Sequence, residues 1–141
     1  MSNRERPIGI FDSGVGGLTV LKEIIKELPE ENTVYLGDTA RVPYGIRSNE
    51  IVTRYSLESA KFLMSKKIKI IVVACNTSSS VSLPFLTKKF HVPVLGVIEP
   101  GARAAVAMSK TKKISVIGTE TTIKSNSYKN AIKAIDSSAE V

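Results

Sequence analysis

Cysteine, histidine and tryptophan are scarce in this sequence of 141 residues, which has one cysteine, one histidine and no tryptophan. A lone cysteine cannot form a disulfide within the chain or serve as half of a redox pair, and this pattern is typical of the reducing cytoplasm. One cysteine and one histidine are also too few for a zinc cluster. We therefore expect a cytoplasmic protein and no metal site.

Long apolar runs are missing as well. The longest strongly apolar run covers Ile70 to Cys75, far below the roughly 20 residues that a membrane-spanning helix needs. The first residues, MSNRERPIGIFD, hold an apolar stretch too short for a signal peptide. With 43% hydrophobic and 23% charged residues, the composition is typical of a globular domain without a membrane segment.

The net charge of +7 raises the question of nucleic-acid binding. The lysines lie in scattered pairs at positions 66–67, 88–89 and 112–113, near predicted helix ends or strand starts, where lysine suits the helix dipole and the solvent. No aromatic residues alternate with them to stack on bases. We expect a solvated surface and no nucleic-acid partner, with a non-catalytic basic binding module as the alternative.

Short β-like segments alternate with helical patterns along the chain. Such alternation predicts parallel strands joined by right-handed crossovers, and hence an α/β fold with a parallel sheet and flanking helices. Apolar strand centres agree with a sheet covered on both faces. The predicted strands are Ile8–Phe11, Thr33–Leu36, Ile68–Ala74, Val94–Val97 and Ile114–Ile117, and the predicted helices are Leu18–Leu28, 49–66, Val81–Phe90, Ala102–Ser109 and Ile123–Ala134.

The carboxyl ends of these strands are the predicted site, because ligands of such folds bind there. In this sequence those ends bring carboxylates, hydroxyls, an amide and the one thiol to the same edge of the sheet. The segments concerned are Asp12-Ser13-Gly14, Gly37-Asp38-Thr39, Cys75-Asn76-Thr77, Ile98-Glu99-Pro100 and Gly118-Thr119-Glu120.

The first of these ends continues into a glycine-rich loop, Asp12-Ser13-Gly14-Val15-Gly16-Gly17. Glycines allow backbone N–H groups to approach an anion at the start of the following helix. The loop is not a dinucleotide fingerprint, because the third glycine would fall at Thr19, and no Gly-Lys-Ser/Thr of a phosphate-binding P-loop follows. A plain tight turn would not explain the Asp-Ser pair, so the pattern favours a binding loop.

Cys75 ends an apolar run in the segment VVACNTSSS, residues 72–80. A phosphatase loop would need arginine where Val81 stands, and a cysteine hydrolase would need a histidine base. The only histidine, His91, precedes its strand and so belongs to the opposite edge of the sheet. Nearby donors and a helix N-terminus would favour a thiolate that can act as a base, while a buried structural cysteine remains the alternative.

Taken together, the blocks IGIFDSGVGGL (8–18), GDTARVPYG (37–45), VVACNTSSS (72–80), GVIEPG (96–101) and VIGTETTIKSNSY (116–128) closely resemble the glutamate racemase family. The resemblance implies cofactor-independent interconversion of L- and D-glutamate for the bacterial cell wall. By this resemblance Cys75 is the catalytic base for D-glutamate. The chemistry of the residues adds Asp12 as the second predicted catalytic residue, because its carboxylate can attract the substrate ammonium and help orient or activate the thiol. The implied substrate-binding residues are Asp12, Ser13, Pro43, Tyr44, Gly45, Asn76, Thr77, Thr119 and Thr122.

The sequence also departs from this family. Racemases of the family are about twice as long, fold as two similar α/β domains with the substrate between them, and carry a second catalytic cysteine that is missing here. The resemblance implies that residues 1–97 form most of the first domain and residues 98–141 begin the second, so the chain by itself is expected to be inactive. Thr121 stands where the family usually has glycine. An aspartate or related racemase is an open alternative, and the resemblance also allows a homodimer.

Overall fold

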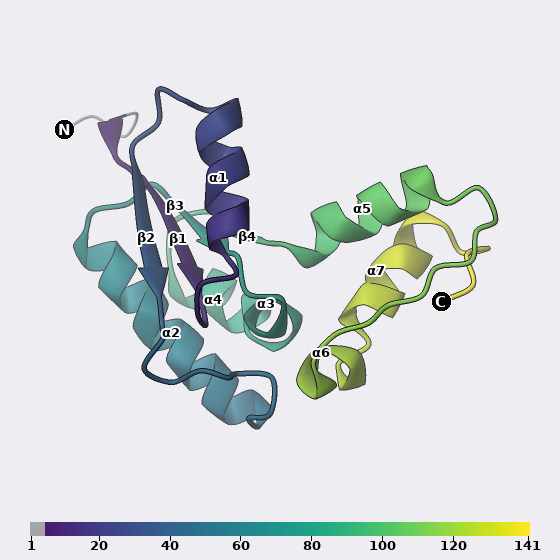
Figure 1. Cartoon of the computed structure of the whole chain (residues 1–141). Coiled ribbons are helices and arrows are strands. Elements are labelled where there is room, and N and C mark those ends of the chain that lie inside the picture. The colour runs from purple at the N-terminus through teal and green to yellow at the C-terminus, as the bar shows by residue number, and fades with distance from the viewer. Residues whose placement is uncertain (1–4) are drawn as a thin grey trace.

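The computed structural model describes residues 5–141, and its N-terminal part forms a four-stranded parallel sheet (Figure 1). The strand order is β2-β1-β3-β4, and every neighbouring pair is parallel. The α/β class with a parallel sheet is therefore confirmed. The strands are β1 Ile8–Asp12, β2 Thr33–Gly37, β3 Ile70–Val73 and β4 Val94–Gly96.

Helices flank both faces of this sheet. α1 packs on the face that carries Ile10, while α2 and α4 pack on the face that carries Phe11. All five residues of β1 are buried, because this strand lies inside the sheet with helices on either side. The helices are α1 Leu18–Glu27, α2 Asn49–Ser65, α3 Asn76–Val81, α4 Leu83–Lys89, α5 Ile98–Met108, α6 Glu120–Lys124 and α7 Ser127–Ile135.

The predicted strand Ile114–Ile117 is wrong. This segment contains no strand. The nearest β-type pairing is one isolated parallel bridge, between Lys113 and Glu140. A strand needs a neighbour to satisfy its N–H and C=O groups, and within the described residues the sheet ends at β4. Ile117 is 96% exposed, so its apolar side chain does not reflect burial in a core.

Several predicted helix bounds also change. α3 precedes the predicted helix Val81–Phe90 as a separate turn of helix, and α4 then begins at Leu83 with a proline in its first turn. The predicted helix Ile123–Ala134 is divided into α6 and α7 at Asn126, whose φ of 55° is left-handed. Glu99, expected at the end of a strand, lies in the first turn of α5 and is exposed.

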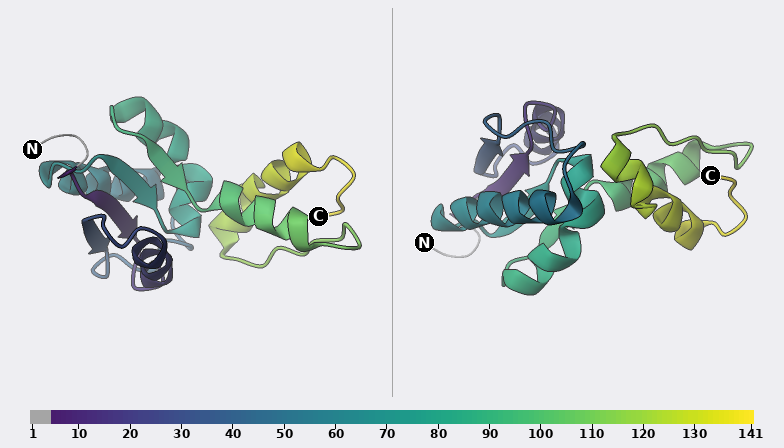
Figure 2. Two further views of the ribbon diagram at one scale, coloured as in Figure 1. Left: turned by 90° about the horizontal axis from the view of Figure 1, so that it is seen from above. Right: turned by 90° about the horizontal axis from the view of Figure 1, so that it is seen from below.

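The elements after β4 form a second group beside the sheet, seen in green and yellow in Figures 1 and 2. α5 packs against α7 around the buried side chains of Ala102, Ile132 and Ala139. α6 contacts α3 of the first group. Since α3 begins directly after Cys75, the contact between the two groups lies next to this cysteine in the sequence. Within residues 5–141, no helix combines the length and apolar character needed to cross a membrane.

Candidate functional site

Asp12 shapes the glycine-rich loop at the end of β1. Its side chain is buried, and Oδ2 accepts the Gly14 N–H at 3.1 Å and the Gly17 N–H at 3.0 Å. Gly17 must be glycine, because a Cβ there would lie 2.6 Å from Asp12 Cβ and 2.9 Å from Ala74 Cβ. The carboxylate therefore holds the loop at the start of α1, and its orientation is fixed by backbone donors.

Cys75 caps α3 at the end of β3. Its Sγ accepts the Ser78 N–H at 3.4 Å and donates to Ser13 Oγ, also at 3.4 Å. The sulfur is largely enclosed, since Cys75 is 5% exposed. Ser13 and Cys75 come from neighbouring strands, so the parallel sheet brings them together, as expected for the carboxyl edge of β1 and β3.

Tyr35 was missed by sequence reasoning. It lies on β2, and its hydroxyl donates to the Gly14 carbonyl at 3.1 Å. Burial, followed by the nearby charges of Asp12 and Cys75, raises the pKa of Tyr35 above its usual 10. The phenol is thus a neutral neighbour of both predicted catalytic residues. No sequence signal pointed to Tyr35, because its place opposite Ile10 is set by the parallel register, which is known only from the structure.

Tyr44 points away from the solvent. Its side chain is 1% exposed and its hydroxyl donates to the Asp38 carboxylate, which also accepts Arg41 Nε at 2.7 Å. Burial, and then this bond to Asp38, raise the pKa of Tyr44. The neighbouring Pro43 is exposed and follows a cis peptide bond. Of these two predicted residues, Tyr44 could therefore contact a ligand only through its backbone.

Gly45 lies against the start of α6. A Cβ at this position would be 2.4 Å from Thr119 Cβ, so only glycine allows this close approach. The Gly45 carbonyl accepts the backbone N–H of Thr121 at 3.3 Å. The loop after β2 is consequently joined to a helix of the second group.

Three predicted threonines form one cluster of hydroxyls. Thr77 Oγ1 lies 3.0 Å from Thr119 Oγ1 and 3.4 Å from Thr122 Oγ1, and the last two are 3.0 Å apart. Thr119 also caps α6, since its Oγ1 accepts the Thr122 N–H at 3.4 Å. The cluster joins α3 to α6, and its hydroxyls can reorient to donate to a ligand.

Asn76 is held by a residue that the prediction did not single out. Tyr128 of α7 donates its hydroxyl to Asn76 Oδ1 at 2.6 Å. Asn76, Thr119 and Thr122 line a hollow of about 500 Å³ together with Tyr128 and Gly118. Most of the predicted residues thus lie in one series of contacts, from the Asp12 loop through Cys75 to this hollow, whereas Pro43 is exposed and the Tyr44 side chain is directed to Asp38.

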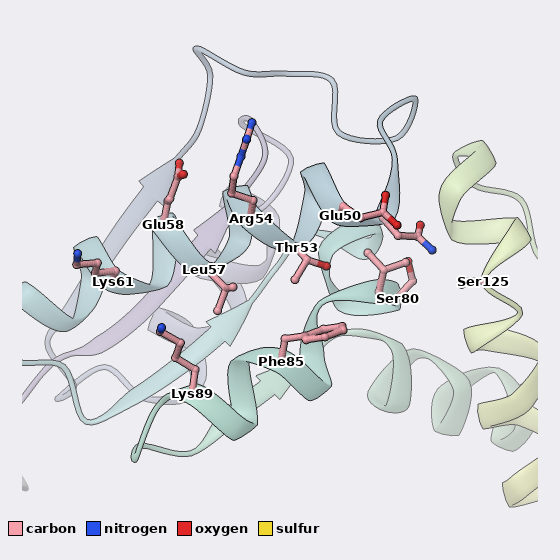
Figure 3. Close-up of a pocket in the computed structure, with 12 residues that line it drawn as sticks. Glu50, Thr53, Arg54, Leu57, Glu58, Lys61, Ser80, Phe85, Lys89 and Ser125 are labelled. Carbon is pink, nitrogen blue, oxygen red and sulfur yellow. The ribbon is translucent and has the colours of Figure 1, made fainter.

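A groove of about 810 Å³ lies elsewhere, between α2 and α4 (Figure 3). Leu57 and Phe85 flank it, and charges of both signs surround it, including Arg54, Glu58 and Lys89. None of the predicted site residues lines this groove. Among residues 5–141, no three His, Cys, Asp or Glu side chains are grouped in a way that could hold a metal ion.

The fold is that of a racemase family. The family model for Asp/Glu/Hydantoin racemase matches residues 8–141, and the chain belongs to this family. It is 61% identical to the glutamate racemase of Geobacter metallireducens over 136 residues, which are 96% of this chain and 50% of that protein.

Solved structures of racemases superpose on almost the whole chain. A glutamate racemase isoform from Bacillus anthracis gives a TM-score of 0.94 at 48% identity, covering 98% of this chain and 52% of that one. The enzyme from Francisella tularensis, solved in complex with D-glutamate, gives 0.89 at 37% identity, with coverage of 98% and 52%. The chain therefore spans about half the length of the relatives it matches.

Proposed function

We propose that this chain carries the half of a glutamate racemase site that acts on the α-hydrogen of D-glutamate, without a cofactor. The observation that carries the proposal is the position of Cys75, whose Sγ lies between the Ser78 N–H and the Ser13 hydroxyl at the carboxyl edge of the sheet. Membership of the racemase family supports the reaction class. In the opposite direction the same thiol would return a proton to the carbanion and so complete D-glutamate, which would serve peptidoglycan synthesis.

The proposed chemistry starts with a thiolate at Cys75. The Ser78 N–H favours the anion, and the thiolate removes the α-proton of the bound amino acid. Negative charge then develops on the substrate carboxylate. Hydroxyl donors such as Thr77 and Thr119 would stabilise this charge, because fixed dipoles in an enclosed site need little reorganisation during the reaction.

Asp12 would act through position and charge. Its Oδ2 is held by two backbone N–H groups, so the carboxylate can attract the substrate ammonium without moving. In the described part of the chain its hydrogen bonds go to the loop, whereas the Cys75 thiol contacts Ser13. We therefore propose that Asp12 orients the substrate and assists the thiol electrostatically.

An uncovered apolar surface beside α1 supports the proposed division into two domains. Val20 and Ile24 of α1, together with Val72 and Leu95 of the sheet, line a groove of about 690 Å³. In a sheet covered on both faces these side chains would be buried. We propose that residues 1–97 form most of one α/β domain, which needs further cover on this face, and that residues 98–141 begin a second.

The test is an NMR titration of the isotopically labelled chain with D-glutamate. We expect amide shifts centred on Ser13, Asn76 and Thr77, and weaker shifts with D-aspartate, whose carboxylates are closer together. Glutarate, which has both carboxylates but no amino group, should bind more weakly if Asp12 receives the ammonium. Shifts spread over the lysine pairs and equal for all three acids would instead indicate nonspecific anion binding and would refute the proposal.

A further inference from the structure

Thr121 connects two parts of the chain that are far apart in sequence. Its side chain is 9% exposed, and its Oγ1 lies 3.0 Å from the Gly45 carbonyl oxygen and 3.1 Å from that of Arg47. Its backbone N–H also donates to the Gly45 oxygen at 3.3 Å. One residue of α6 thus supplies both donors to the turn that follows Tyr44.

The loop that receives these bonds is anchored at one end by the buried Tyr44 side chain, which donates to Asp38, whereas the turn that follows Gly45 is exposed. Its own turn is closed by the Arg47 N–H, which donates to the Tyr44 carbonyl at 2.9 Å. Ile46, Arg47 and Ser48 are exposed, so few apolar contacts hold the turn in place. Beyond Tyr44, the buried Thr121 hydroxyl and the Thr121 N–H are therefore the groups that hold the exposed turn against α6.

The contact between Gly45 and the start of α6 tolerates little movement of the loop. Gly45 approaches α6 so closely that a Cβ would overlap Thr119. Thr119 in turn belongs to the hydroxyl cluster with Thr77 and Thr122. A shift of the loop away from α6 would change the distance between the Gly45 backbone and this cluster.

We propose that Thr121 is a positioning residue, whose hydroxyl holds the Tyr44–Arg47 segment against α6 and so places the Gly45 backbone beside Thr119. This proposal rests on the proposed function, because it treats Gly45 and Thr119 as parts of the glutamate site. Thr121 acts through these groups and does not itself contact the substrate.

The first measurement is hydrogen exchange of the Arg47 and Thr121 amides, without ligand. The Thr121→Val variant keeps the shape of the side chain but removes the hydroxyl. We expect exchange of these two amides about 3- to 10-fold faster, the range for loss of an ordinary hydrogen bond, while amides of β1 and β3 are unchanged. Thr121→Ser, which retains the hydroxyl, should restore slow exchange.

Thr87→Val is the matched control. Thr87 is an exposed residue of α4 without a side-chain hydrogen bond in the described structure, so the same chemical change should leave the Tyr44–Arg47 amides as they were. Equal exchange in Thr121→Val and Thr121→Ser would overturn the proposal that the hydroxyl holds the loop.

The second measurement is the apparent Kd for D-glutamate from NMR shifts. We expect Thr121→Val to weaken binding several-fold and Thr121→Ser to bind as the unsubstituted chain does. Faster exchange with an unchanged Kd would overturn the positioning role. Failure of the unsubstituted chain to respond to glutamate would count against the proposed function instead, and the exchange comparison distinguishes the two failures because it needs no ligand.

Discussion

The thiol of Cys75 and the hydroxyl of Ser13 lie 3.4 Å apart, although 62 positions separate them in the sequence. Parallel pairing of β1 with β3 creates this contact, since Ser13 comes one residue and Cys75 two residues after strands that end at the same edge. The thiol is therefore neither enclosed by apolar side chains alone nor freely exposed. It has a polar neighbour on one side and a helix N–H on the other.

The reactivity of Cys75 gives the first prediction. If the thiol belongs to a site, iodoacetamide should label it in the folded chain, at a rate that does not change with low concentrations of urea. Saturating D-glutamate should slow this labelling several-fold, because the ligand would cover the sulfur. Mass spectrometry measures the rate. A labelling rate that rises in proportion to the unfolded fraction and does not change with glutamate would indicate a core cysteine.

Tyr44 gives the second prediction, on stability. Tyr44→Phe keeps the ring but removes the donor to the buried Asp38 carboxylate, so the free energy of unfolding should fall by about 1–3 kcal/mol. Urea denaturation followed by circular dichroism measures the loss. Tyr55→Phe is the matched control, because the Tyr55 hydroxyl has no hydrogen bond in the described structure; an equal effect of both substitutions would contradict the argument.

The general fold, and the edge of the sheet that carries the candidate site, could be predicted from the sequence. Alternation of strands and helices gives a parallel sheet, and a parallel sheet brings the ends of its strands to one edge. This rule alone places Asp12 and Cys75 at that edge, whereas their catalytic roles depend on the resemblance and stay predictions. The positions of Pro43 and Gly45 depended on the resemblance, because a turn by itself does not indicate a site.

The remaining features depend on contacts that local sequence does not encode. Ile114–Ile117 has the composition of a strand, but strand formation needs a pairing partner along its length, and the described chain provides only the single bridge between Lys113 and Glu140. The bonds from Tyr128 to Asn76 and from Thr121 to Gly45 join positions 52 and 76 residues apart. Such contacts arise from the packing of α6 and α7 against the first group, which no periodicity predicts.

Asp136 gives a prediction on pH. Donors from Ser138 and Lys112 lower its pKa from 3.8 to about 2. A carboxyl group with a lowered pKa in the folded state adds stability above about pH 4, and this contribution is lost as the pH falls towards about 2. Asp136→Asn should therefore lose less thermal stability across this interval than the unsubstituted chain. Glu23→Gln, at an exposed position of α1, is the control. The prediction would be refuted if the melting temperatures of all three proteins fell by the same amount across this pH interval.

Gly45 gives a prediction on packing between the two groups. Gly45→Ala would place a methyl group within 2.4 Å of Thr119, so α6 or the loop must move, and overpacking of this kind costs about 1–3 kcal/mol. Gly14→Ala is the comparison, since a methyl group there would meet its nearest atom, Val42 Cγ2, at 3.7 Å. Urea unfolding should show a clear loss for the first variant and a smaller one for the second. Equal losses would mean that the close approach of Gly45 to Thr119 is not maintained in solution.

The number of thiols gives the last prediction. Racemisation through a carbanion removes a proton from one face of the α-carbon and returns one to the other, so two acid–base groups on opposite sides are needed. This chain has one cysteine, and in the proposed site Cys75 lies on the face of the D-enantiomer. Without an opposing wall to exclude water and fix the substrate, which can contribute several kcal/mol to lowering the barrier, even exchange on this face should be slow.

Incubation of the 141-residue chain in D₂O with each enantiomer, followed by NMR and chiral chromatography, should show no net racemisation, and any α-deuteration should be confined to D-glutamate and absent in Cys75→Ser. Robust conversion of D- to L-glutamate by the purified chain would overturn the two-thiol mechanism and the view that these residues carry only half of the site.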